Sequence, residues 1–190
     1  MENAASQLIK LYMDEQVLTG SIYYAPTPEA RLLDALNGLS DMGPVKRGKF
    51  LELNDVTIVH ADGRSEKISV SYINRSTVIL AATLGGVNAG RGIGGRPGPK
   101  SYPYVDKSTV PVRLETQHYF IVGNMYRVDS QKVWYVLEDN QPFLPLTSAE
   151  IQNRDASTTE LMPFLAVNKE HIISVHEENG QKRINFIKPK

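Results

Sequence analysis

The stretch with the clearest spacing for ligand chemistry is the glycine-rich segment at residues 85–107. Within it, Gly90-Arg91-Gly92-Ile93-Gly94-Gly95 fits the glycine pattern of dinucleotide-binding turns and follows a hydrophobic run. That chemistry needs a helix N-terminus directly after the glycines, where backbone N–H groups hold the pyrophosphate. Arg96-Pro97-Gly98-Pro99 cannot begin such a helix in register, so we expect no bound cofactor.

Cations and aromatic rings are interleaved in the same segment and form a candidate partner- or anion-binding site. Arg91, Arg96 and Lys100 could contact phosphates, while Tyr102 and Tyr104 could stack on bases. Two other interpretations fit this composition: a linker kept in solution by its charges, and an assembly arm that packs on a neighbouring subunit. The chain has 21 basic and 21 acidic residues, so no net charge draws it to nucleic acid.

Residue types that commonly perform catalysis are dispersed along the chain. His60, His118, His171 and His176 lack the spacing of metal ligands. The absence of cysteine excludes disulfides, thiolate metal sites and thiol nucleophiles, and no serine or threonine stands in a glycine-flanked nucleophile elbow. We therefore predict neither a metal site nor catalytic residues. An enzyme would require a pocket that places His118 or His171 beside a carboxylate.

The overall composition is that of a globular protein. Of the 190 residues, 41% are hydrophobic, which is enough for one large core or two small ones. Met1-Glu2-Asn3-Ala4-Ala5 lacks the features of a signal peptide, and no apolar run reaches membrane-spanning length. The cysteine-free composition fits a reducing compartment. We expect a cytoplasmic protein that does not bind membranes.

The elements that position these residues form two related halves, because local patterns of the first half recur in the second. Gly20, residues 31–37, 50–53 and 72–79 have counterparts in Gly123 and in residues 132–137, 143–146 and 166–173. We interpret residues 1–84 as a first β-rich unit, 85–107 as a basic Gly/Pro-rich linker or excursion, and 108–190 as a second β-rich unit. Units of this size bury little surface alone, so they should pack together or oligomerise.

Several elements of the first unit can be predicted from hydrophobic spacing. The apolar residues of 4–16 fall mostly on one side of a helix, which predicts a short N-terminal helix. Residues 17–24 predict a strand, and Thr27-Pro28-Glu29-Ala30 predicts the start of a helix that ends near residue 37. Residues 50–71 predict a hairpin that turns at Ala61-Asp62-Gly63-Arg64, with a bulge near Asn54-Asp55.

The second unit is predicted to be richer in strands. Residues 132–137 occupy the helix position of the first unit, but their β-branched and aromatic side chains favour a strand. Asn179-Gly180 predicts a hairpin between residues 172–175 and 184–187. Trp134, the single tryptophan, is expected to anchor the core or a subunit interface.

Three motifs carry a resemblance: Arg31-Leu32-Leu33-Asp34-Ala35-Leu36-Asn37, Phe50-Leu51-Glu52-Leu53-Asn54-Asp55-Val56 and Phe164-Leu165-Ala166-Val167-Asn168-Lys169. At these motifs the sequence resembles an uncharacterised family of small bacterial β-rich domains, present here as two divergent copies. The resemblance covers most of both units and none of the glycine-rich segment. The motifs are structural, so the resemblance implies no functional residue.

The sequence thus predicts a mainly β protein (β-rich α+β) of two related small sheets or barrels in a pseudo-symmetric arrangement, with a short N-terminal helix. We expect a non-catalytic binding or assembly module that forms a homo-oligomer or docks on a protein partner. The alternative is a regulatory module that binds nucleic acid or a small anionic ligand through Arg91, Arg96 and Lys100.

Overall fold

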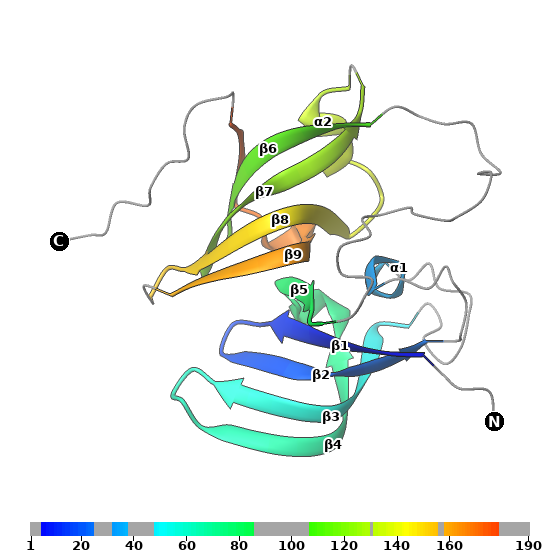
Figure 1. Ribbon diagram of the computed structural model, residues 1–190, viewed down its shortest axis with the longest axis vertical. Coiled ribbons are helices and arrows are strands. Elements are labelled where there is room, and N and C mark those ends of the chain that lie inside the picture. The colour runs from blue at the N-terminus through cyan, green and yellow to red at the C-terminus, as the bar shows by residue number, and fades with distance from the viewer. Residues whose placement is uncertain are drawn as a thin grey trace.

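The computed structural model describes residues 5–24, 32–37, 48–85, 107–129, 131–155 and 158–178. Antiparallel strands dominate these residues, and short helical segments connect some of them (Figure 1). The prediction of a mainly β protein is confirmed. Across these ranges, no helix combines the length and the apolar composition that crossing a membrane requires.

The first half of the chain contributes five strands. β1 (Ala5–Tyr12), β2 (Gln16–Tyr24), β3 (Phe50–His60) and β4 (Ser65–Asn74) are successive antiparallel neighbours, and the helix α1 (Leu32–Leu36) falls between β2 and β3 in the chain. Asn74 caps the 3₁₀ helix η1 (Arg75–Thr77), because its side chain accepts a hydrogen bond from the backbone N–H of Ser76. β5 (Leu80–Thr83) then returns to pair with β1.

The second half repeats this order of elements. Its members are β6 (Lys107–Glu115), β7 (Tyr119–Val128), α2 (Val133–Leu137), β8 (Phe143–Asn153), β9 (Thr159–Asn168), η2 (Lys169–His171) and β10 (Ser174–Glu177). Asn168 caps η2 through Glu170, as Asn74 caps η1. We call residues at equal positions in the two halves counterparts. Descent of both halves from one duplicated unit stays a prediction.

The order of strands within the sheet is also the same in both halves. Among the described residues it is β10-β6-β7-β8-β9-β5-β1-β2-β3-β4, so each half presents its fifth, first, second, third and fourth strands in turn. β5 pairs with β9, and this contact joins the two predicted units edge to edge in one continuous sheet. Figure 1 shows β5 and β9 side by side between the two halves.

Each half bends its third strand at the same place. Asp55 in β3 and Ser148 in β8 are the described non-glycine residues with positive φ, at 51° and 49°. The pairing with the preceding strand shifts beside each of them. A bulge of this kind increases the local twist, which lets a strand curve around a core. The bulge predicted near Asn54-Asp55 is confirmed.

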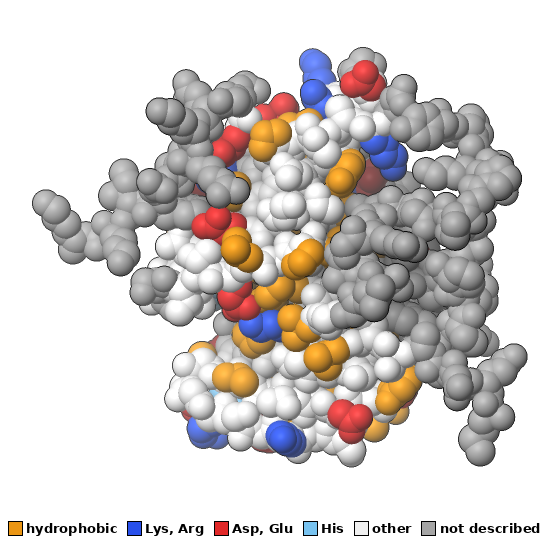
Figure 2. Space-filling view, in the orientation of Figure 1, with side chains coloured by type: hydrophobic (Ala, Val, Ile, Leu, Met, Phe, Trp, Pro, Cys, Tyr) orange, Lys and Arg blue, Asp and Glu red, His pale blue; other side chains and the backbone are white. Residues whose placement is uncertain are grey.

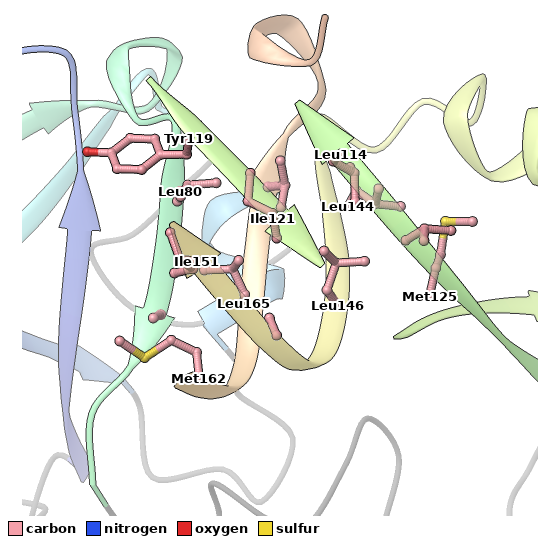
Figure 3. Close-up of a cluster of buried hydrophobic side chains, with 14 of the residues drawn as sticks. Leu80, Leu114, Tyr119, Ile121, Met125, Leu144, Leu146, Ile151, Met162 and Leu165 are labelled. Atoms are coloured by element: carbon pink, nitrogen blue, oxygen red, sulfur yellow. The ribbon is translucent and has the colours of Figure 1, made fainter. Parts of the chain in front are cut away.

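Each half contains a cluster of buried hydrophobic side chains, and each cluster also includes residues from the other half. The first cluster includes Phe143 and Ala166 from β8 and β9. The second includes Leu80 and Ala82 from β5 (Figure 3), in which Leu80 lies beside Tyr119 of β7. Each half therefore completes the core of the other.

The predicted N-terminal helix over residues 4–16 is wrong, since Ala5–Tyr12 form strand β1 and Gln16 begins β2. Burial follows the period of a strand: Ile9 and Leu11 are buried, and Lys10 between them is not. β1 pairs with β2 on one side and β5 on the other. Hydrogen bonds to two neighbours, one of them far along the chain, outweigh a weak local preference for helix.

The predicted strand over residues 132–137 is also wrong, because Val133–Leu137 form helix α2. Val133 is buried, and Val136 and Leu137 pack against the second cluster, which is the spacing of one helical face. Packing of this face outweighs the β propensity of the segment. The hairpin predicted at Asn179-Gly180 lies outside the described residues, as does most of the predicted linker.

Candidate functional site

The residues that the sequence singles out for binding lie outside the described part of the structure. They are Arg91, Arg96, Lys100, Tyr102 and Tyr104. The candidate anion-binding site therefore stays a prediction.

Three of the histidines contact separate partners. His60 Nε2 lies 3.1 Å from Glu66 Oε1, and His118 Nε2 lies 3.4 Å from Asp14 Oδ1. His171 Nε2 lies 2.8 Å from the backbone oxygen of Ser76. Within the described ranges, no group of three or more histidine or acidic side chains could hold a metal ion.

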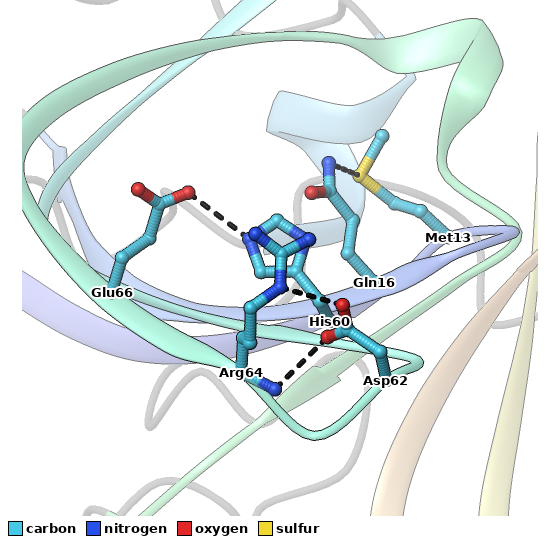
Figure 4. Close-up of polar contacts among 6 residues, drawn as sticks. All are labelled: Met13, Gln16, His60, Asp62, Arg64 and Glu66. Carbon is cyan, nitrogen blue, oxygen red and sulfur yellow. Dashed lines mark hydrogen bonds and ion pairs between the residues drawn. The ribbon is translucent and has the colours of Figure 1, made fainter.

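The surroundings of His60 are those of an ordered turn (Figure 4). Arg64 Nε donates to Asp62 Oδ2 at 2.5 Å, and Gln16 Nε2 donates to Met13 Sδ at 3.8 Å. The backbone N–H of Arg64, followed by its side chain, holds the pKa of Asp62 below its ordinary value. These contacts fix the ends of the β1–β2 and β3–β4 hairpins.

A partly buried polar cluster links the two halves. Lys10 Nζ and Tyr12 Oη, both from β1, lie 2.5 and 3.0 Å from Glu160 Oε2 of β9. The Tyr12 ring meets the Tyr119 ring edge-on, with centroids 5.6 Å apart. Burial raises the pKa of Tyr119 to about 12 and also raises the pKa of Tyr12. Both phenols therefore keep their protons at neutral pH and serve as structural groups.

The junction between β5 and β9 aligns Leu80 with Val167 and Ala81 with Ala166. Asn168 extends this pairing beyond the strand. Its backbone N–H donates to the Ile79 oxygen at 2.9 Å, and its side-chain Nδ2 donates to the Val78 oxygen at 2.9 Å. Asn168 is buried, so these bonds form away from water.

The two strands at the ends of the sheet, β4 and β10, are the counterparts of the two strands that form this junction, β9 and β5. In the described part of the chain, β4 pairs only with β3, and β10 pairs only with β6. β4 is the counterpart of β9, and β10 is the counterpart of β5. Among the described residues the sheet therefore ends in two unpaired edges, and the counterparts of these edges pair with each other at the junction.

Hydrophobic side chains near these edges are exposed where their counterparts are buried. Phe50 is 56% exposed, whereas its counterpart Phe143 is 1% exposed. Ile173 is 67% exposed, whereas its counterpart Ile79 is 1% exposed. The residue types are identical within each pair. Phe143 and Ile79 lie in the two shared clusters, whereas among the described residues no strand follows β4 or β10 at the ends of the sheet.

Further exposed hydrophobic side chains lie along β4, namely Ile68, Val70 and Tyr72. Other large exposed hydrophobic side chains, such as Leu161, lie elsewhere on the described surface. On the face that Figure 2 shows, acidic and basic side chains are scattered among the hydrophobic ones, with no large patch of one sign.

The sequence contains a signal for these edges in the correspondence of its two halves. Phe50 and Phe143 begin corresponding strands, and the runs 72–79 and 166–173 correspond as well. Only the pairing of β5 with β9 shows that such residues meet at an edge. Trp134, expected in a core or an interface, is exposed on α2.

Comparison with family models, with curated proteins and with solved structures gave no match to this chain.

Proposed function

We propose that this protein is a non-catalytic assembly module that self-associates through the two unpaired edges of its sheet. The observation that carries this proposal is the exposure of Phe50 and Ile173, whose identical counterparts are buried at the internal junction. A long unpaired strand with exposed hydrophobic side chains is a template for pairing with another strand.

The energetics favour covering these edges. Burial of one large aliphatic or aromatic side chain contributes about 1.5–3 kcal/mol. Phe50, Tyr72 and Ile173 are each more than half exposed. Their burial, together with backbone hydrogen bonds along β4 and β10, offsets the entropy that association costs.

The proposal is tested by light scattering coupled to size exclusion across micromolar concentrations. We expect a mass that is a multiple of the 21.2 kDa chain. Ile173→Asp should weaken association about tenfold or more, because it removes about 1.5–3 kcal/mol of burial and places a charge in the contact.

Leu161→Asp is the matched control, since Leu161 is an equally large exposed side chain that pairs with Glu150 of β8, away from both end strands of the sheet. It should leave the mass unchanged. A wild-type chain that remains monomeric at every concentration would rule out the proposed function.

A further inference from the structure

We infer that a second copy of this chain covers the edges, with β10 of one copy paired to β4 of the next in the register of the internal junction. The inference rests on the proposed function and specifies its partner. The register within the chain pairs Leu80 with Val167 and Ala81 with Ala166. Transferred to the counterparts, Ser174 pairs with Ile73 and Val175 pairs with Tyr72 of the next copy.

The first argument for this contact is that it would continue the internal junction between β5 and β9. Both halves have the same strand order, so the surface that β5 presents to β9 recurs at β10, and the surface that β9 presents to β5 recurs at β4. The contact between copies would thus continue a sheet that already passes from one half to the other. Two chemically different edges meet in this contact, which is head-to-tail.

The second argument for this contact comes from the two asparagines that cap η1 and η2. Asn74 has φ and ψ of −66° and 120°, and Asn168 has −71° and 120°. At the internal junction, Asn168 donates from its backbone and side chain to the oxygens of Ile79 and Val78. In the next copy, the counterparts of these acceptors are the backbone oxygens of Ile173 and Ile172. Asn74 can therefore donate the same two hydrogen bonds, from its backbone N–H and its side-chain Nδ2, to these oxygens of the next copy.

Charge supplies a third and independent step. The Lys10–Glu160 ion pair, 2.5 Å long, bridges β1 and β9 across the internal junction. The counterpart of Lys10 is Arg113 in β6, and the counterpart of Glu160 is Glu66 in β4. Both positions keep the sign of their charge. Arg113 Nε is buried without a hydrogen-bond partner in the described part of the chain.

A fourth contact links the helix to the neighbouring half. The backbone N–H of Phe143 donates to Asn37 Oδ1, at the end of α1, at 2.8 Å. The counterpart of Asn37 is Glu138, at the end of α2, and the counterpart of Phe143 is Phe50. The Glu138 carboxylate would accept from the Phe50 N–H of the next copy.

A head-to-tail contact that repeats either closes into a ring or extends as a filament. The internal junction between β5 and β9 is already one contact of this kind, and there each hydrophobic cluster includes residues from both halves. In either form, every β4 inside the assembly meets a β10 of the neighbouring copy. A different segment could cover the free edge of β10 in place of a second copy. It is the chain's own residues 184–187, which the sequence predicts to form a hairpin with residues 172–175.

Disulfide trapping tests the register directly, because the natural chain has no cysteine. One preparation carries Ile73→Cys and a second carries Ser174→Cys; the two are mixed and oxidised. We expect a covalent pair of chains on a non-reducing gel, since each disulfide can form only between copies. Val175→Cys mixed with Ile73→Cys is the control, because a shift of one residue moves the side chain to the opposite face.

The internal counterpart pair, Leu80→Cys with Val167→Cys in one chain, calibrates the yield for this strand geometry. The matched mixture should form about tenfold more covalent pair than the shifted mixture. An oligomer by light scattering with no preference for the matched mixture would overturn the register and leave the proposed function standing. A monomer at every concentration, as the hairpin with residues 184–187 requires, would overturn both.

Discussion

Tyr119 shows how a single side chain can report on the junction between the halves. Its phenol is buried beside Tyr12, and burial raises its pKa from an ordinary value of 10.0 to about 12. In the unfolded chain the phenol loses its proton near pH 10. Between these two pKa values the unfolded state binds fewer protons than the native state, so the free energy of unfolding falls as pH rises.

We therefore expect the contribution of Tyr119 to the free energy of unfolding to be constant below about pH 10 and to decrease towards pH 12. Urea titrations at a series of pH values would measure this slope. Tyr119→Phe, which keeps the ring and removes the ionisable group, should make the slope shallower, and Tyr12, whose pKa burial also raises, should keep the rest of it. An equal slope in the variant and the natural chain would contradict the assignment to Tyr119.

At the scale of the element, the parts predicted correctly are those set by neighbours in the sequence. The β3–β4 hairpin is an example, because alternation over residues 50–60 and the turn at Asp62-Gly63 are local signals. β1 and α2 were predicted wrongly because distant packing decides them. β1 lies between β2 and β5, and Val133 of α2 is buried against the second cluster.

The candidate edges could not be predicted from neighbouring residues, because distant packing decides them as well. Whether Phe50 is exposed or buried depends on which strand follows β4 in the sheet, and no residue near Phe50 encodes that neighbour. Correspondence of the halves suggests the answer only after the pairing of β5 with β9 is known. The five residues of the glycine-rich segment predicted to bind a partner stay a prediction.

Gly20 and Gly123 allow a matched test of the bent strands. A Cβ at Gly20 would lie 3.1 Å from the Asn54 oxygen and 3.2 Å from Val56 Cγ2, whereas a Cβ at Gly123 would lie no closer than 3.4 Å to any neighbour. Gly20→Ala should cost about 1–3 kcal/mol through this crowding. Gly123→Ala should change stability by less than about 1 kcal/mol, because lower entropy of the unfolded chain offsets the tighter fit.

Urea unfolding of both glycine variants measures this difference. The natural chain supplies the reference free energy. If Gly123→Ala proved as costly as Gly20→Ala, crowding by the bulged strand would not explain the glycine at position 20.

At the scale of the whole molecule, a sheet with two open ends must avoid random pairing. Charged and polar side chains occupy the start of β4, including Glu66 and Lys67, and natural edge strands use such residues to discourage promiscuous contacts. In the inferred assembly the same Glu66 meets Arg113 of the next copy. One side chain can thus oppose unspecific pairing and favour a single register.

Trp134 gives a direct optical measure of that assembly, because it is the only tryptophan in the chain. It is 62% exposed, whereas its counterpart Leu33 in α1 packs against the first cluster, and α1 contacts β8 across the internal junction. In the inferred assembly, α2 would contact β3 of the next copy and cover the indole. Dilution should therefore shift the fluorescence emission to longer wavelength as the assembly dissociates. Ile173→Asp should already emit at the longer wavelength when concentrated, and emission that stays constant while the mass falls to one chain would exclude α2 from the contact.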